Sequence, residues 1–322
     1  MTTAGATLSS GQLRAERWRL RVAGWRSFWR RYRRKRAGVL GLAVLVVFGT
    51  MALFPGLLAG PFQDVTAGTA DTLVGPSAAH LLGTDELGRD ILNLTVYGAR
   101  TSLTIGLVAT FMTIFLGAVV GIAAGYIGGA VDTVLMRITD FFLILPTFVL
   151  ALILAPIVLD SIKGTPLASG DFFGVSVQLV VIILIIAITS WASTARILRS
   201  QTLSLKERAF VDRARVIGSS STHIMWRHIL PNCLALIVAN AVLTVTISIL
   251  TESTLSFVGL GDPSQPSWGQ MLESAQAVGA PGLGAWWYTF APGVSIVLVM
   301  LAFTLVGNAL DEILNPKLSV RQ

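Results

Sequence analysis

Long runs without a charged residue alternate with short charged segments along this chain. Six runs of at least 19 residues stand out: residues 37–60, 101–131, 141–159, 172–195, 229–251 and 274–310. A helix that crosses the hydrocarbon core of a bilayer needs roughly 20 apolar residues, so each run is long enough for one crossing. The pattern predicts an all-α polytopic membrane protein with six transmembrane helices.

The last run is long enough for two crossings, but its first part is typical of a loop. Residues 278–284 hold three glycines and a proline, which favour turns over a continuous helix. Residues 286–288 are Trp-Trp-Tyr, a group that predicts an aromatic band at the membrane interface. Residues 290–310 then remain as the sixth crossing.

These runs divide the chain into five predicted segments. They are a cytoplasmic arm (1–36), the first transmembrane helix (37–60), an extracytoplasmic loop (61–98), a five-helix core (99–311, with an inner loop at about 196–231) and a cytoplasmic tail (312–322). The first run is not expected to be a cleaved signal peptide. It follows a 36-residue arm and exceeds the apolar region of such peptides, about 7–15 residues.

The basic residues predict which side of the membrane each loop occupies. With the N-terminus inside, 21 of the 24 Lys and Arg residues lie in inner segments, and only Arg89, Arg100 and Lys163 lie outside. Cytoplasmic loops carry an excess of Lys and Arg. Both termini are therefore predicted to be cytoplasmic.

Composition narrows the class of protein further. Hydrophobic residues make up 53% of the chain and charged residues 13%. An average soluble domain has about 25% charged residues, so the composition disfavours an ordinary cytosolic enzyme, and it excludes a disordered chain. The single cysteine, Cys233, excludes an intrachain disulfide. Three histidines and one cysteine leave little material for a transition-metal site, and none is predicted.

The N-terminal arm combines an aromatic stripe with many arginines. Trp18, Val22, Trp25, Trp29 and Tyr32 are spaced by four, three, four and three residues, which places them on one face of a helix. A basic helix with such a face is predicted to lie in the membrane interface. The alternative is an unstructured arm that acts only as a topology signal. Nucleic-acid binding is not expected, because the arm adjoins a membrane span.

The inner loop has the pattern of a short amphipathic helix followed by a turn. Phe210, Ala214 and Ile217 recur at helical spacing among charged residues, and Gly218 follows them. Glycine commonly ends a helix there because it tolerates a positive φ. The hydroxyl residues at 219–222 offer a cap for a second helix. The loop suits docking to a soluble partner; the alternative is a solvated loop that binds anionic lipid.

Several motifs resemble those of ABC-transporter type-1 permeases. In that family's coupling loop a Glu-Ala-Ala triplet precedes a glycine, and Leu-Pro follows; the matching positions here are Asp212, Ala214, Gly218, Leu230 and Pro231. Asp212 replaces the family's Glu, and an arginine replaces its first Ala. More motifs resemble the dipeptide/oligopeptide/nickel branch, and specifically its C-type subunit. They are Leu-Gly-Thr-Asp-Glu-Leu-Gly-Arg-Asp (82–90), Tyr-Gly-Ala-Arg (97–100), Gly-Tyr-Ile-Gly-Gly (125–129), Leu-Ser-Phe-Val-Gly-Leu-Gly (255–261) and Pro-Ser-Trp-Gly (266–269).

The resemblance implies a function and a set of partners. It implies a multi-pass permease subunit in the bacterial cytoplasmic (inner) membrane that translocates di- or oligopeptides by alternating access. The implied partners are a homologous second permease, two ABC ATPase subunits and an extracytoplasmic solute-binding protein. Phe210, Ile217 and the matched loop residues would contact an ATPase. Cargo is not readable from this chain, because the binding protein largely selects it in this family.

The chain itself carries no ATPase motif, so it is not predicted to be an enzyme. None of its four lysines belongs to a Gly-x-x-x-x-Gly-Lys-Ser/Thr sequence, the loop that cradles ATP phosphates. ATP and Mg²⁺ are expected on the partner ATPases, with no cofactor and no metal on this chain. His223 and His228 are five residues apart and are expected to diverge on a helix.

A polar stripe follows the predicted fifth helix. Asn240, Thr244, Ser248 and Glu252 lie four residues apart and therefore share one face. The stripe is predicted to line the translocation path; the alternative is polar contact between helices of the bundle. Asp140 is the other acid close to membrane depth, where acids usually face a cavity or a partner.

Glycines at 117, 121, 125 and 129 also fall at every fourth residue. They predict a face on which another helix packs closely. Three alternatives to a peptide permease stay open. They are a permease of the same fold for nickel chelates or glutathione, a stand-alone secondary transporter or channel, and a membrane enzyme. No internal repeat or catalytic constellation in the sequence favours the last two.

Overall fold

The computed structural model describes residue 23 and residues 26–165, 171–172 and 175–314. Residues 26–33 are helical, and the elements after them are mostly helices. They are α2 (Arg36–Leu53), α3 (Pro55–Ala59), α4 (Phe62–Ala67), α5 (Ile91–Ile127), α6 (Gly129–Ile144), α7 (Thr147–Ile162), β1 (Asp171–Phe172), β2 (Val175–Ser176), α8 (Val177–Lys206), α9 (Ala209–Val216), α10 (Ser221–Ile224), the π-helix η1 (Met225–Ile229), α11 (Leu230–Leu255), the π-helix η2 (Ser256–Leu260), α12 (Trp268–Ala277) and α13 (Trp286–Leu314). The strands β1 and β2 form one small antiparallel hairpin.

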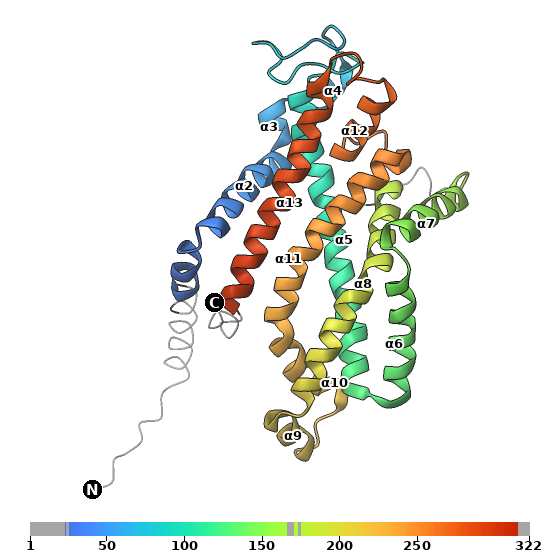
Figure 1. Ribbon diagram of the computed structural model, residues 1–322. Coiled ribbons are helices and arrows are strands. Elements are labelled where there is room, and N and C mark those ends of the chain that lie inside the picture. The colour runs from blue at the N-terminus through green and yellow to red at the C-terminus, as the bar shows by residue number, and fades with distance from the viewer. Residues whose placement is uncertain (1–22, 24–25, 166–170, 173–174, 315–322) are drawn as a thin grey trace.

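The long helices form an elongated bundle, with α5 inside it (Figure 1). Five helices are long and apolar enough to cross a membrane: α2, α5, α8, the helix at Ser221–Leu260 and α13. The bent pair α6–α7 makes a sixth crossing if it is counted as one span. The all-α membrane fold is confirmed, with the predicted six crossings as its upper count.

The third predicted crossing, residues 141–159, is wrong as a single straight helix. The chain breaks between α6 and α7, whose axes are bent by 92°. Leu145 has φ −80° and ψ 130°, which is extended backbone, and Pro146 follows it. Proline disfavours helical backbone in the preceding residue and lacks an N–H for helix hydrogen bonding. The lack of charge in residues 141–159 correctly predicted an apolar segment, but it did not predict this break.

Helix α5 begins ten residues earlier than the uncharged run that predicted it. Asp90 caps its first turn, and its carboxylate oxygen Oδ1 accepts hydrogen bonds from the backbone N–H groups of Leu92 and Asn93. The helix has 37 residues and is therefore about 55 Å long. It exceeds the roughly 30 Å hydrocarbon core, so it can carry Arg100 in its outer part.

The predicted close-packing face of α5 lies directly against α8. An added Cβ at Gly117, Gly121 or Gly125 would lie 2.4–2.8 Å from atoms of Thr194, Ala195 or Thr202. Only glycine permits this approach of the two backbones. Gly129 does not belong to this face, because it is the first residue of α6 and has a φ of +56°. A Cβ added at Gly129 would meet nothing within 4 Å.

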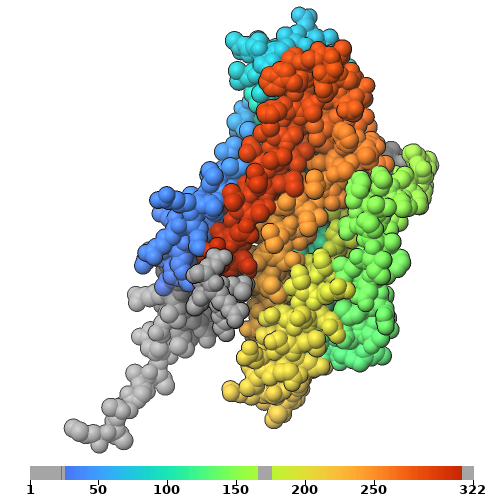
Figure 2. Space-filling view, in the orientation of Figure 1, coloured from blue at the N-terminus to red at the C-terminus, as the bar shows by residue number. Residues whose placement is uncertain are grey.

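The two ends of the bundle differ in the segments that they carry. The start of α2, the end of α13 and the α9–α10 loop lie toward one end, and α3, α4 and α12 lie at the other (Figure 1). An ion pair between Lys35 and Glu312 joins the start of α2 to α13. Both of these helix ends therefore lie on the side of the inner loop, as the charge distribution predicted. In the view of Figure 2, α13 and α11 cover most of α5.

The N-terminal aromatic stripe is described only in part. Trp18, Val22 and Trp25 lie outside the described residues. Trp29 and Tyr32 stack with ring centroids 5.6 Å apart, and Arg33 lies over the Trp29 ring. Tyr32 is buried and donates a hydrogen bond to the Gly38 carbonyl oxygen. The described part is therefore helical and anchored to α2, while its position in the interface stays a prediction.

Candidate functional site

The inner loop between α8 and α11 forms a compact projection at the end of the bundle. Helix α9 ends near Gly218, which has a φ of +86°, as its place after the helix predicted. The hydroxyl of Ser220 accepts a hydrogen bond from the N–H of His223 and so caps α10, within the predicted capping segment. The local sequence thus fixes where α9 stops and α10 starts.

One face of α9 packs on the chain's own core. Val211 is fully buried and Ala214 is 7% exposed, and both belong to a hydrophobic cluster that includes residues of α5 and α8. Phe210 is partly buried against the same cluster. Small Ala214 therefore allows α9 to approach its own bundle, whereas the resemblance implied that Ala214 would contact an ATPase. Val211 was missed because the helical spacing was counted from Phe210.

The predicted stripe of Phe210, Ala214 and Ile217 does not form a single buried face. Ile217 is 83% exposed and its neighbour Val216 is 87% exposed. Ile217 is the C-cap residue of α9, and its N–H still donates to the Arg213 carbonyl oxygen, so the helix continues to this point but only its part up to Ala214 packs on the bundle. Two apolar side chains therefore project from the inner end of the bundle.

Charged groups surround this apolar pair. Asp212 forms an exposed ion pair with Arg215, with a nitrogen–oxygen distance of 3.2 Å. Arg215 and Lys206 lie over the ring of Tyr126, at 5.6 Å and 5.8 Å from its centroid. A hydrogen bond to Tyr126, together with nearby carboxylates that include that of Asp212, raises the pKa of the Arg215 guanidinium. The loop thus contacts the inner end of α5 through Tyr126.

The second half of the loop enters α11 through a π-helix. Pro231 lies in the first turn of α11, where the missing N–H of proline is harmless. The wider π-helical turn brings residues five apart close together, and the His223 and His228 rings are 6.0 Å apart. The expectation that these rings diverge was therefore wrong. In the described part of the chain, no group of three or more His, Cys, Asp or Glu residues could hold a metal ion.

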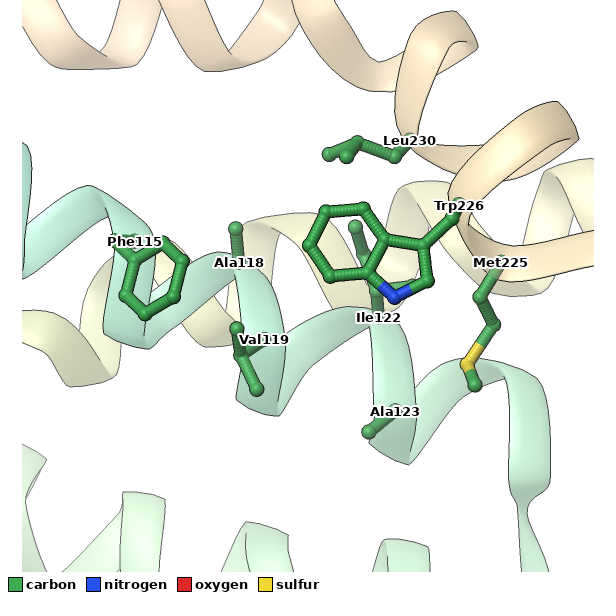
Figure 3. Close-up of a pocket in the computed structure, with 8 residues that line it drawn as sticks. All are labelled: Phe115, Ala118, Val119, Ile122, Ala123, Met225, Trp226 and Leu230. Atoms are coloured by element: carbon green, nitrogen blue, oxygen red, sulfur yellow. The ribbon is translucent and has the colours of Figure 1, made fainter. Parts of the chain in front are cut away.

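An apolar pocket of about 180 Å³ lies between this loop and α5. Figure 3 shows the indole of Trp226 reaching over the α5 side chains Ala118 and Ile122, with Leu230 beside it. Trp226 is 58% exposed. Leu230, which the resemblance assigned to the coupling loop, therefore also joins the loop to the bundle.

Two ion pairs join α6 to α8 near the same end. Arg199 holds Asp132 with two nitrogen–oxygen distances of 2.5 Å and 2.6 Å. Arg196 pairs with Asp140 at 2.5 Å. Asp140 thus has a partner on a neighbouring helix, one of the two environments expected for it.

The polar stripe of α11 faces the chain's own helices. Asn240 donates a hydrogen bond from Nδ2 to Thr194 of α8 at 2.9 Å. Ser248 is fully buried and accepts a hydrogen bond from Thr110 of α5 at 3.0 Å. Thr244 is also buried, and its hydroxyl donates to the Asn240 carbonyl oxygen. In this structure the stripe therefore makes polar contacts between helices, which was the alternative to lining the translocation path.

Glu252 ends the stripe in a setting of hydroxyl groups. It is fully buried, and Ser253 and Ser256 donate hydrogen bonds to its carboxylate at 3.2 Å and 2.9 Å. Nearby, the hydroxyl of Ser102 in α5 accepts a hydrogen bond from the N–H of Trp268. These contacts join the outer ends of α5 and α11 to α12.

The acidic motif before α5 is a folded turn. Asp85 is fully buried, and its carboxylate accepts hydrogen bonds from the N–H groups of Leu87 and Arg89 and from Arg89 Nε. Trp287 of α13 donates its indole N–H to the Thr84 carbonyl oxygen at 3.2 Å. The motif holds the outer loop on the bundle, a role that the sequence did not reveal.

Two protein families match this chain, in two ranges separated by residues 77–116. Residues 117–320 match the family described as binding-protein-dependent transport system inner membrane component. Residues 24–76 match the N-terminal transmembrane domain of oligopeptide transport permease C. Together these ranges include the inner loop, α11 and the start of the outer loop.

Similar proteins align over most of both chains and have related names. The dipeptide transport system permease protein DppC of Bacillus subtilis is 35% identical over 293 residues, covering 90% of this chain and 85% of that protein. The glutathione transport system permease protein GsiD of Pectobacterium atrosepticum is 35% identical over 299 residues, covering 91% of each. The oligopeptide transport system permease protein OppC of Bacillus subtilis is 32% identical over 296 residues, covering 91% and 90%.

These matches agree with the helices and motifs described above, and the relatives are named as permease components. The chain is a multi-pass inner-membrane protein that belongs to the family of binding-protein-dependent transport system inner membrane components.

Proposed function

We propose that this chain is one of two homologous permease subunits of an ATP-driven importer that moves di- or oligopeptides into the cell. Relatives named for dipeptide and oligopeptide transport match about nine tenths of the chain, which supports peptides as the cargo. The absence of an ATP-binding loop in the sequence supports two separate ATPase subunits that hold ATP and Mg²⁺. An extracytoplasmic solute-binding protein delivers the cargo.

One observation carries the proposed coupling to the ATPases. Val216 and Ile217 project into water at the inner end, with exposures of 87% and 83%. Neighbouring apolar side chains on the water side favour a protein partner that covers them. Asp212 and Arg213 are exposed charged residues of the same helix, and protein interfaces commonly have such a polar rim around an apolar centre.

The packing of the loop supports a lever mechanism. Val211 and Ala214 attach α9 to the cluster that includes α5 and α8 residues, and Trp226 attaches the following turn to α5 (Figure 3). ATP binding draws the ATPases together and moves this loop, and the bundle then opens outward. The loaded binding protein favours the same state, since a ligand shifts an equilibrium only through unequal affinity for its states. Hydrolysis resets the inward-facing state.

The double variant Val216→Asp/Ile217→Asp tests the coupling contact. Both side chains are exposed, so the change leaves the chain's own packing intact. We expect the variant to reach the membrane normally but to lose co-purification of the ATPase subunits and peptide uptake. Asp212→Ala, which removes only an exposed ion pair worth roughly 0–1 kcal/mol, should reduce both activities far less than the double variant. Normal ATPase association in the double variant would contradict the proposal.

Glutathione is the second candidate cargo. The relative named for glutathione transport is as similar to this chain, at 35% identity, as the relative named for dipeptide transport. Uptake of a radiolabelled dipeptide in competition with unlabelled glutathione distinguishes the two. We expect unlabelled dipeptides to compete and glutathione to compete weakly; the reverse order would make glutathione the cargo.

A further inference from the structure

A large groove opens in the outer half of the molecule, away from the inner loop. It has a volume of about 1220 Å³ and lies between the α2–α3 junction, α5 and α8, with Gln265 and Pro266 at its rim. Ligand pockets commonly occupy about 300–1,000 Å³, so the groove has room for a small peptide. Most of its lining is apolar, which makes each polar group in it informative.

Arg100 is the cation of this groove. It lies on α5, is exposed and lines the groove. Three basic residues belong to the predicted outer segments, and two of them have acidic partners: Arg89 pairs with Asp85, and Lys163 pairs with Asp160. Within the part of the chain that the structure describes, no acidic side chain forms an ion pair with Arg100.

Arg100 lies in the outer part of α5, and it lines the groove. It is nine residues inside α5 (91 to 100), or about 13 Å along the helix axis. Charged side chains near membrane depth usually face a cavity and mark a ligand or ion pathway. The guanidinium group is also suited to bidentate recognition of a carboxylate. The groove therefore presents one unpaired anion-binding group.

The side chains that follow Arg100 along α5 form a graded stripe. Thr104, Val108 and Met112 lie four, eight and twelve residues further on and all line the groove, so they share one helix face with Arg100. Twelve residues correspond to about 18 Å of helix, the length of roughly five residues of extended peptide. The stripe offers a cation at its outer end, then a hydroxyl, then an apolar surface.

We propose that Arg100 binds the terminal carboxylate of the peptide during its passage, with the rest of the peptide extended along the α5 stripe. Thr104 and Gln265 supply hydrogen-bonding groups for the peptide backbone, and Val108 and Met112 accept apolar side chains. This proposal rests on the proposed function and deepens it, because it gives the permease itself a preference for cargo with a free carboxylate.

A lipid phosphate could satisfy the same guanidinium. The peptide is the better occupant, because the groove wall also carries the hydroxyl groups of Thr101 and Thr104, to which a peptide backbone can hydrogen-bond and a lipid chain cannot. The two occupants respond differently to lipid composition and to amidation of the cargo. These responses separate them experimentally.

The test uses the complete transporter in proteoliposomes, with trialanine and trialanine amide as probes. The binding protein is loaded to equal occupancy with each probe, as checked by equilibrium dialysis, so its own selectivity does not enter. Wild type is compared with Arg100→Gln, Arg100→Lys and Lys163→Gln. The last is the matched control, because Lys163 is an outer cation that already has a partner.

We expect wild type to transport trialanine roughly tenfold or more faster than the amide at subsaturating loading, as a charge-assisted hydrogen bond implies. Arg100→Gln should slow trialanine to the rate of the amide, and Arg100→Lys should restore part of the difference. Lys163→Gln should behave as wild type. Membrane levels and ATPase association of every variant establish that the complex is assembled.

Two outcomes overturn the proposal. In the first, Arg100→Gln leaves the ratio of the two rates unchanged in the assembled complex, whether or not both rates fall. In the second, the effect appears only in vesicles with anionic lipid and is equal for both probes, which would assign Arg100 to lipid. If wild type accumulates neither peptide while hydrolysing ATP, the peptide function itself is wrong, and the carboxylate site fails with it.

Discussion

Gly218 determines the geometry of the inner loop at a single position. Its φ is +86°, and an added Cβ would meet nothing within 4 Å, so a substitution acts through backbone strain alone. Gly218→Val should cost about 1–2 kcal/mol in the turn and strongly reduce uptake at a normal membrane level. Gly218→Asn is the control, because asparagine tolerates this conformation. Equal uptake by both variants would remove Gly218 from the coupling contact.

The same stretch shows what residue-level sequence analysis can reach. The position of Gly218 after a helical pattern predicted its left-handed conformation, because that requirement is local. The burial of Val211 and the exposure of Ile217 were not predicted, because they depend on how α9 docks on the bundle. An apolar stripe in a short helix does not specify which surface it meets.

At the scale of elements, the contact of α5 with α8 depends on small residues. A Cβ added at Gly121 would lie 2.4 Å from the Ala195 carbonyl oxygen, whereas a Cβ at Gly49 of α2 would meet nothing within 4 Å. Gly121→Ala should destabilise the protein by about 1–3 kcal/mol through overpacking. Gly49→Ala should not lower stability, because alanine favours helix. Thermal unfolding in detergent compares the pair, and equal melting temperatures would refute close packing as the role of Gly121.

The polar stripe of α11 gives a second prediction for an element. With Cys233 replaced by alanine, cysteine at position 240 should react with a small aqueous thiol reagent in the nucleotide-free complex. Cysteine at position 248 should be protected, because Ser248 is fully buried and Asn240 is not. Labelling of position 248 that appears only with a trapped non-hydrolysable nucleotide would support the lining role. Equal labelling of both positions without nucleotide would contradict the packing described here.

Two element-level features explain where the sequence prediction stopped. The break at Leu145 and Pro146 lies inside an uncharged run. Hydropathy measures how apolar a segment is and does not report a change in the direction of the helix axis. The π-helical turn of η1 alters which residues face each other, so the His223–His228 spacing was misjudged. Proline at position 146 was the available signal for the first feature; no local signal marked the second.

At the scale of the whole molecule, the distribution of charge predicts the topology. Reporter fusions after Gly75 and after Gly279 should report the outside, and fusions after Ser204 and at the C-terminus the inside. The reason is the concentration of 21 of 24 basic residues in the inner segments, because cytoplasmic loops carry an excess of Lys and Arg. Alkaline phosphatase and green fluorescent protein fusions make the measurement. An inside signal after Gly75 would overturn the assignment of every helix that follows.

The helical class and the number of possible crossings were predictable because apolar length is a property of single segments. The pairing of α5 with α8 was partly predictable from the glycine spacing. The outer groove was not, since Arg100 and Gln265 are far apart in sequence and only the fold brings them to one cavity. Long-range geometry of this kind leaves no trace in a local pattern.

The energy source of transport separates the proposed importer from a stand-alone transporter. The most direct measurement is uptake of a radiolabelled dipeptide into proteoliposomes that contain this chain, its partner permease and both ATPases. We predict accumulation that requires ATP on the ATPase side and the loaded binding protein, and that persists when an ionophore collapses all ion gradients. Accumulation by this chain alone, driven by an ion gradient and independent of ATP, would contradict the account.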